Sequence, residues 1–291
     1  MTVSELLKHF VAQEDLNFLL TNRIPRMALT HFMGWFSQLR NPWLAKASIW
    51  VWRQFADLDL SEAKEQRFDS LHDCFIRQLR DGARPVDHDT QTLVSPCDGI
   101  VGAMGEVVEG QLFQAKGFPY SLQDLLGDSA QHGPWQNGKF ITIRITSSMY
   151  HRFHAPHDGR LHRVEYFSGD TWNVNPIALK RVEKLFCKNE RAMLEMEVGT
   201  QRHPIALVPV AAVLVASIRL HALDTLLHTR YGGPKVMACD AHFHKGQELG
   251  WFQHGSTILV FTPKHFDFAP GLQEGCVLRM GQALMRLPLN P

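Results

Sequence analysis

One short segment concentrates side chains that can exchange protons. The stretch YHRFHAPH begins at Tyr150 and places His151, His154 and His157 three residues apart. Histidine titrates near neutral pH, so a histidine pair beside Tyr150 and Arg152 suits acid–base chemistry. Three histidines could also hold a metal ion, but in an extended chain His151 and His154 point to opposite faces. We therefore predict acid–base chemistry and no metal site.

Two other segments could supply a nucleophile and its support. The sequence SPCDG forms an Asp-Gly turn at Asp98 and Gly99, and KGQELGWFQHGST carries Gly255 and Ser256 directly before a β-branched run. A serine hydroxyl becomes a good nucleophile only when a base removes its proton and a further group orients that base. Taken singly, each segment is an ordinary turn. The sequence contains no G-x-S-x-G elbow, Walker A loop, G-x-G-x-x-G or H-E-x-x-H motif.

The elements around these segments divide the chain in two. Residues 1–81 carry apolar side chains at helical spacing, from Trp43 to Val51 and again from Phe75 to Leu79. Residues 82–92 contain Gly and Pro and are typical of a linker. From residue 93 to 291, short β-branched runs alternate with turn residues. We predict an α+β protein with an N-terminal amphipathic helical module and a mainly β, sandwich-like or barrel-like catalytic body.

Composition excludes several classes of protein. The 291 residues include 30 Lys+Arg and 29 Asp+Glu, and 45% are hydrophobic, which is typical of a globular protein and not of a nucleic-acid binder. Five scattered cysteines form neither a disulfide framework nor a zinc ribbon. The start of the chain lacks the pattern of a secretory signal. The longest apolar stretch, IALVPVAAVLVASI at 205–218, is too short to span a bilayer and is predicted to form buried strands.

Together these segments resemble the bacterial-type phosphatidylserine decarboxylases, a pyruvoyl-dependent family. The matching stretches are FIRQLRDGARPVD, SPCDG, QAKGFPYSLQDLLG, YHRFHAP, NPIALKRVEKLFCKNER, KGQELGWF and the final GST. A family processing site of L-G-S-T places the self-cleaved bond between Gly255 and Ser256. The chain departs from the family at His254 (usually Leu), at Cys97 (usually a small apolar residue) and at Asn173 (usually Ser).

The resemblance implies how the chain makes its own cofactor. Asp98 would orient His154, and His154 would deprotonate Ser256, whose oxygen attacks the Gly255 carbonyl in an N-to-O acyl shift. β-Elimination would release a 1–255 chain and leave a dehydroalanine. Hydrolysis with loss of ammonia would then leave an N-terminal pyruvoyl group, the expected covalent cofactor, on a 256–291 chain.

The resemblance also implies the reaction. The pyruvoyl group would form a Schiff base with the amine of phosphatidylserine and act as the electron sink while CO2 leaves, yielding phosphatidylethanolamine, a step in phospholipid biosynthesis. His151 is the candidate acid that protonates the carbanion, and a pKa near neutrality would suit that role. Arg152 is a candidate partner for the phosphate or carboxylate, and Val174 and Asn175 are expected to line the substrate site.

The N-terminal residues fit a lipid substrate. Residues 1–56 hold four of the seven Trp and six Lys/Arg against three Asp/Glu. Such helices often pack in a core, but an enzyme whose diacyl substrate stays in the bilayer must dock on it. We therefore expect a peripheral protein on the cytoplasmic face of an anionic cell membrane, without a transmembrane helix. Its two chains would stay together as a heterodimer, and further dimerisation is left open.

Three alternatives remain at this point. The first is a serine hydrolase using Asp98, His154 and Ser256 without self-cleavage, which the missing nucleophile elbow disfavours. The second is a non-catalytic protein that binds a metal or a lipid, with histidines as ligands. The third is a pyruvoyl enzyme acting on a smaller amino acid, against which the hydrophobic N-terminal helices argue.

Overall fold

The computed structural model describes residues 14–22, 25–113, 118–131, 133–214, 217–253 and 256–288. Its helical segments are α2 (Glu14–Asn22), α3 (Arg26–Ser37), α4 (Pro42–Phe55), α5 (Leu71–Phe75), α6 (Leu122–Leu126), the 3-10 helix η1 (Gly127–Gln131), α7 (Pro176–Arg181) and α8 (Leu185–Lys188). Its strands are β1 (Thr92–Val94), β2 (Gly99–Glu106), β3 (Gln111–Phe113), β4 (Pro119–Ser121), β5 (Lys139–Ile145), β6 (Arg152–His154), β7 (Gly159–Phe167), β8 (Arg191–Val198), β9 (His203–Ala211), β10 (Ser217–Leu220), β11 (Thr225–His228), β12 (Val236–Phe243), β13 (Glu248–Phe252), β14 (Ser256–Thr262), β15 (Asp267–Phe268), β16 (Val277–Leu278) and β17 (Ala283–Arg286). Helices followed by a mainly β body confirm the predicted α+β class.

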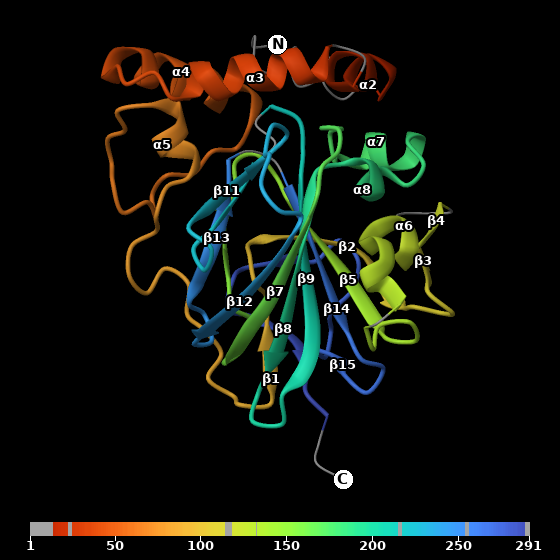
Figure 1. The fold of residues 1–291 in the computed structure, drawn as a ribbon. Coiled ribbons are helices and arrows are strands. Elements are labelled where there is room, and N and C mark those ends of the chain that lie inside the picture. Colours follow the sequence, from red (N-terminus) through yellow and green to blue (C-terminus); the bar gives the residue numbers. More distant parts are fainter. Residues whose placement is uncertain are drawn as a thin grey trace.

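The N-terminal helices form a layer of their own. Figure 1 shows α2, α3 and α4 in a row along one end of the molecule, beyond the ends of the strands. Local sequence explains where α4 begins: the Asn41 side chain accepts hydrogen bonds from the backbone N–H groups of Trp43 and Leu44, and Pro42 occupies the first turn. Among the helices described, none is both long and apolar enough to cross a membrane.

An eight-stranded antiparallel sheet forms the body. Its strand order is β12-β7-β8-β9-β14-β5-β2-β16, and the smaller sheets are β11-β10-β13-β6, β1-β17-β15 and β3-β4. The alternating run ITIRIT lies in β5, and the apolar stretch at 205–218 supplies most of β9 and the start of β10. Both segments are strands, as predicted.

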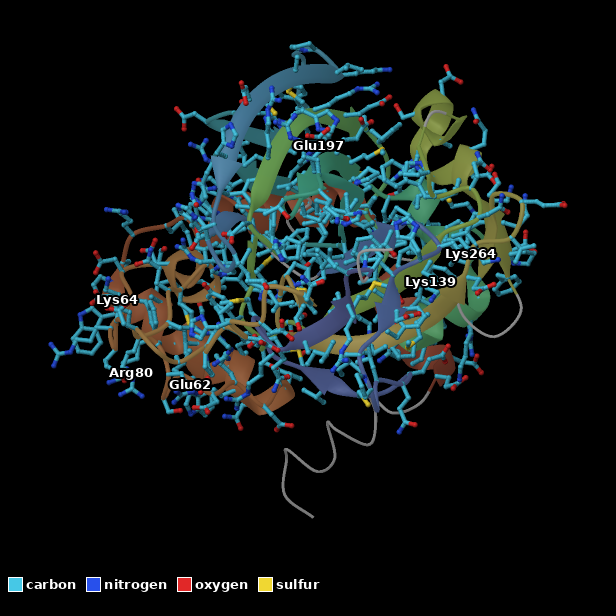
Figure 2. All side chains as sticks on the ribbon, turned by 90° about the horizontal axis from the view of Figure 1, so that it is seen from below. Glu62, Lys64, Arg80, Lys139, Glu197 and Lys264 are labelled. Atoms are coloured by element: carbon cyan, nitrogen blue, oxygen red, sulfur yellow. The ribbon has the colours of Figure 1, made fainter. Side chains whose placement is uncertain are left out.

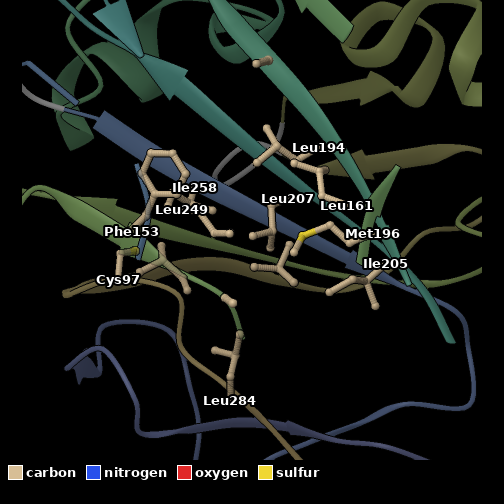
Figure 3. Close-up of a cluster of buried hydrophobic side chains, with 14 of the residues drawn as sticks. Cys97, Phe153, Leu161, Leu194, Met196, Ile205, Leu207, Leu249, Ile258 and Leu284 are labelled. Carbon is tan, nitrogen blue, oxygen red and sulfur yellow. The ribbon is translucent and has the colours of Figure 1, made fainter. Parts of the chain in front are cut away.

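The two faces of the large sheet are covered differently. One face packs against the four-stranded sheet through a cluster that includes Phe153, Leu249 and Ile258, together with Cys97 at its edge (Figure 3). The other face packs against α6, α7 and α8 through a second cluster, which includes Leu259. Because side chains alternate along a strand, consecutive residues of β14 belong to different clusters.

The chain between α4 and β1 corrects one prediction. The helical spacing from Phe75 to Leu79 predicts a helix there, but α5 ends at Phe75. Leu79 instead forms a β-bridge with Ala63, and backbone bonds join Lys64 to Gln78 and Arg80 to Glu62. These pairings satisfy the backbone groups that a longer helix would have used, so the helix stops.

The predicted linker at 82–92 lies against the body. The backbone N–H of Asp87 donates to the carbonyl of Gly281, and Arg84 reaches Asp98 and Glu62. Figure 2 shows Glu62, Lys64 and Arg80 together on one side of the molecule, where the 57–80 segment runs. The division of the chain into domains at these boundaries stays a prediction.

Candidate active site

His154 ends strand β6 as a buried, neutral ring. Its Nδ1 lies 2.8 Å from the carbonyl oxygen of Gly246, and the Tyr150 hydroxyl lies 3.0 Å from its Nε2. A carbonyl only accepts, so Nδ1 carries the proton and Nε2 accepts from Tyr150. Burial lowers the pKa of His154 below its ordinary value, opposed in part by the Gly246 hydrogen bond. The ring is therefore in the form that a general base requires.

His151, three residues earlier, is more deeply buried. Its Nδ1 lies 2.8 Å from the Met149 carbonyl oxygen, and its ring packs against Phe75 with centroids 4.0 Å apart. Among the described residues its Nε2 has no hydrogen-bond partner. Burial lowers the pKa of His151 to about 3, away from the near-neutral pKa that would suit an acid, and its role as the acid stays a prediction. At neutral pH the ring is uncharged, and its unprotonated Nε2 lies in an apolar surrounding. The ring therefore does not carry the extra proton that an acid would donate.

Ser256 is the first residue of β14 and is fully buried. Its backbone lies between Ile145 of β5 and Ala211 of β9. By alternation its side chain shares a face with Ile258, the face that meets the four-stranded sheet. The hydroxyl has no partner within the described part of the chain. Gly255 and His254, on the other side of the predicted cleavage, lie outside the described residues.

Two connections between the sheets bring the histidine segment close to Ser256. The chain leaves β5 at Ile145, beside Ser256, and reaches His151 six residues later. The chain also approaches β14 from β13, where the backbone N–H of Phe252 donates to the carbonyl of His151. The histidine segment is therefore joined by a short stretch of chain to β5 and by a backbone hydrogen bond to β13, the strands that flank and precede the serine.

Asp98 lies on the bend between β1 and β2, with a different partner from the one implied by the family resemblance. Arg84 donates to its carboxylate from Nε at 2.8 Å and from Nη2 at 2.6 Å, and the Met280 backbone N–H donates at 2.9 Å. Both ring nitrogens of His154 are bonded elsewhere. Asp98 thus does not contact His154 in this structure, and its orienting role stays a prediction.

The three expected substrate-binding residues have structural partners. Arg152 donates to Glu248 at 2.7 Å and to the Ile76 carbonyl at 2.8 Å, so its charge is already balanced. Val174 packs in the second cluster, across the large sheet from the face of Ser256. Asn175 caps α7, accepting from the Ala178 backbone N–H. Nothing described brings these three together around the serine.

The sequence did not reveal a buried acid, Glu190, which lies two strands from Ser256 at the same end of the large sheet. Glu190 directly precedes β8, and its backbone carbonyl accepts a hydrogen bond from the backbone N–H of Ala211. Ala211 in turn pairs with Ser256, so it lies between the two residues. The Tyr166 hydroxyl lies 2.7 Å from Glu190 Oε1 and 2.8 Å from the His228 carbonyl oxygen. The Tyr166 hydroxyl can donate to either of these two oxygens, but its single proton favours one of them at a time. Burial raises the pKa of Glu190 to about 8. The only sequence signal was a charged NER triplet among apolar residues.

The histidine segment shows why a metal is a poor fit here. The Nδ1 atoms of His151, His154 and His157 each face a different backbone carbonyl oxygen. Within the described ranges, no three His, Cys, Asp or Glu side chains are grouped so that they could hold a metal ion.

Comparisons with known proteins identify the family of the chain. The model of the family described as phosphatidylserine decarboxylase matches residues 71–286. Two relatives named phosphatidylserine decarboxylase proenzyme, from Yersinia pestis (strain Pestoides F) and Yersinia pseudotuberculosis serotype O:1b (strain IP 31758), are each 34% identical over 281 residues, covering 92% of this chain and 95% of theirs. This chain therefore belongs to the phosphatidylserine decarboxylase family and is an enzyme of that kind.

Proposed function

We propose that the chain is a proenzyme that cuts itself between Gly255 and Ser256 and then converts phosphatidylserine to phosphatidylethanolamine and CO2. The observation that carries the proposal is the buried Ser256 hydroxyl without a described partner, at the head of a strand paired on both sides. A buried hydroxyl left unpaired is unfavourable and needs a reason. Attack on the preceding peptide bond supplies one.

His154 serves as the base in this self-processing. Its Nε2 takes the Ser256 hydroxyl proton as the oxygen attacks the Gly255 carbonyl, forming an ester as the peptide nitrogen is released. Removal of the Cα proton then expels the 1–255 chain as a carboxylate and leaves dehydroalanine at position 256. Water replaces its nitrogen, which departs as ammonia, and a pyruvoyl group remains on the 256–291 chain. Tyr150 now occupies the required nitrogen, so its hydroxyl must give way first.

The residues around position 256 fit such a group. When present, the pyruvoyl carbonyl withdraws the electrons left by CO2. Strands β5 and β9 flank position 256 on both sides. Phe75 and the neutral His151 pack against each other, and we place them beside that position as an uncharged wall. Loss of CO2 removes a carboxylate charge, so an uncharged wall favours the product. We assign His151 Nε2 to relay a proton from water to the carbon from which CO2 has left, because this nitrogen has no described partner.

The serine hydrolase alternative is less well supported. It requires the acid, the base and the serine to be joined in the resting enzyme. Asp98 is instead bound by Arg84, and both nitrogens of His154 have other partners.

Docking on the membrane follows from the exposed side chains of α2, α3 and α4. Eight of the eleven large hydrophobic side chains exposed in the described ranges lie on these helices: Leu19, Met27, Phe32, Trp35, Trp43, Trp50, Val51 and Phe55. Trp43 is 81% exposed. Aromatic side chains at one end of the molecule suit the interface of a bilayer, and nearby basic residues suit its anionic headgroups (Figure 1). We assign this end to the cytoplasmic face of the cell membrane.

Mass spectrometry under denaturing conditions tests the processing. The wild-type protein should give two chains, 1–255 and 256–291, the smaller beginning with a pyruvoyl group. The Ser256→Ala variant should remain one chain of 33.1 kDa and release no CO2 from phosphatidylserine vesicles. Ser217→Ala, which alters another buried serine with an unpartnered hydroxyl, is the matched control and should be cut normally. An intact wild-type chain that still decarboxylates the lipid would refute the proposal.

Vesicle flotation tests the docking. Replacing Trp35, Trp43 and Trp50 by Gln should abolish flotation with anionic vesicles and leave self-cleavage intact, because these side chains are exposed and far from the serine in sequence. Replacing the exposed Val236 and Val277 by Gln is the control. Equal flotation of the tryptophan variant would show that these helices are not the docking surface.

A further inference from the structure

A cavity of about 280 Å³ opens on the face of the large sheet opposite that of Ser256. Strands β2, β5 and β14 form its floor, and α7 forms one wall. Its polar lining is Thr142, Arg144, Lys180 and Thr257, together with one acid, Glu274, which forms no ion pair with Arg144 in the described structure. Thr257 directly follows the serine that begins β14, so the cavity reaches the reactive end of that strand.

Arg144 is the unusual side chain of this cavity. It is half-buried, yet it has no ion pair and its guanidinium has no hydrogen bond to any described residue. The more buried Arg84 and Arg152, by contrast, each donate to a carboxylate. Burial lowers the pKa of Arg144, with no neighbouring charge opposing the shift. A half-buried guanidinium without a paired carboxylate favours an anion beside it.

A second polar group without a partner faces Arg144. Thr257 lies opposite Arg144 in the β5–β14 ladder, and adjacent strands are about 4.8 Å apart. The Thr257 hydroxyl is buried and has no hydrogen-bond partner in the described structure. By alternation, both side chains project to the face that carries Thr142 and α7. A guanidinium beside a hydroxyl donor matches the oxygens of a phosphate.

The dimensions fit the substrate's own phosphate. In phosphatidylserine one oxygen and two carbons separate the phosphorus from the amine nitrogen, so bond lengths of about 1.5 Å keep the two within roughly 5 Å. A phosphate beside Thr257 therefore lies one residue from the group that takes the amine. Ser256 heads its chain after cleavage, so a ligand at that end can reach both faces of the sheet.

The cavity also lies on the way from the membrane. Helix α7 packs under α2, with Arg181 donating to Asp15 at 2.8 Å. Figure 1 shows α7 next to the helical layer whose exposed side chains we assign to the bilayer. Lys180, about half exposed, stands at the rim. Lys180 belongs to α7, the helix of the cavity that contacts α2, and its Nζ also lies 3.9 Å from Glu14 Oε1.

We propose that Arg144, with the Thr257 hydroxyl and with Lys180 at the rim, binds the phosphodiester of phosphatidylserine. This assignment rests on the proposed function, because it presumes that position 256 takes the amine of the same lipid. Under this proposal the two faces of β14 bind different parts of the substrate. The Ser256 face handles the proton and the carboxylate, and the Thr257 face holds the phosphate.

Steady-state kinetics with Arg144→Gln test the proposal. Self-cleavage, followed on a denaturing gel, should be unchanged and reports that the variant folds. The KM for phosphatidylserine in mixed micelles should rise about tenfold or more, with kcat within a factor of about three, because the phosphate contact is made in both the ground and transition states. Arg144→Lys should recover part of the loss. Lys139→Gln, which removes a cation from the other end of β5, is the control.

A binding measurement distinguishes a site for the lipid headgroup from a site for free phosphate. In the uncleaved Ser256→Ala chain, calorimetric titration with glycerophosphoserine and with inorganic phosphate should show binding that Arg144→Gln removes. An unchanged KM overturns the proposal, and inorganic phosphate binding with an unchanged KM would make this a free-phosphate site. A wild-type chain that neither cleaves itself nor releases CO2 would instead refute the proposed function.

Discussion

The two ends of the large sheet contrast sharply. The end away from the N-terminal helices carries a cavity of about 910 Å³ whose lining includes His157, His203, His242 and His244. The other end carries Ser256 and His151, both fully buried. The larger cavity has more histidines, but its His244 side chain is 93% exposed. Both nitrogens of its buried His157 face backbone carbonyl oxygens. The proposed site therefore lies at the end of the sheet where buried polar atoms without described partners coincide with the family's motifs, and not at the end with the larger cavity.

We expect the largest difference between the two ends of the sheet in the rate of self-cleavage, when a histidine at each end is replaced. His154→Ala removes the nitrogen that takes the serine proton, and loss of a general base slows a reaction by about 10²- to 10⁴-fold. Gel analysis of freshly purified protein should show the variant as an uncut chain. His244→Ala, at the large cavity, should be cut at the wild-type rate. Normal cleavage of His154→Ala would assign the base to another residue.

We expect the second-largest difference in how much one ion pair at each end of the sheet contributes to the free energy of unfolding. Arg84 and Asp98 have side chains 8% and 9% exposed, whereas Arg160 and Asp240 at the large cavity are 39% and 64% exposed. Arg84→Gln leaves a buried carboxylate unpaired and should lower the free energy of unfolding by about 3–5 kcal/mol. Arg160→Gln should lower it by less than about 1 kcal/mol.

Urea unfolding of both variants in the Ser256→Ala background, which keeps the chain continuous, would measure these losses. Equal losses would show that burial does not distinguish the pairs. A slower self-cleavage of Arg84→Gln in the otherwise wild-type chain would further link Asp98 to the reaction.

The sequence was informative where local pattern decides structure. Period-two alternation identified β5, and the apolar run at 205–218 identified buried strands, because these patterns report burial directly. The helix expected to reach Leu79 failed because bonds to residues 62–64, distant in sequence, replaced the helical ones. The partner of Asp98 was missed for the same reason: Arg84 belongs to a segment that reads as a linker.

The candidate site could be predicted only as far as its motifs. His151, His154 and Ser256 follow from short segments and a family pattern. Arg144 could not be found this way, because its half-burial and lack of an acid partner are properties of the packed sheet. Glu190 was missed similarly, since a charged residue in sequence gives no sign that burial will raise its pKa.

The last comparison concerns the pH dependence of stability at the two ends of β8, where Glu190 precedes the strand and Glu197 lies near its other end (Figure 2). Burial raises the pKa of Glu190 from 4.5 to about 8, so the unfolded chain ionises first as pH rises. Its contribution to stability is therefore present below about pH 4.5 and is lost progressively up to about pH 8. Glu190→Gln cannot ionise, and its amide can still donate to the Tyr166 hydroxyl.

The variant should match the parent chain near pH 4.5 and exceed it at pH 8 by on the order of 4 kcal/mol, since one pKa unit corresponds to about 1.4 kcal/mol. Urea unfolding at several pH values in the Ser256→Ala background measures this difference, with Glu197→Gln as the control. A gain that does not grow with pH would mean that Glu190 is already ionised in the folded protein. The Tyr166 hydroxyl would then donate to Glu190 and leave the His228 carbonyl without its proton, so the same titration decides which way that hydrogen-bond chain runs.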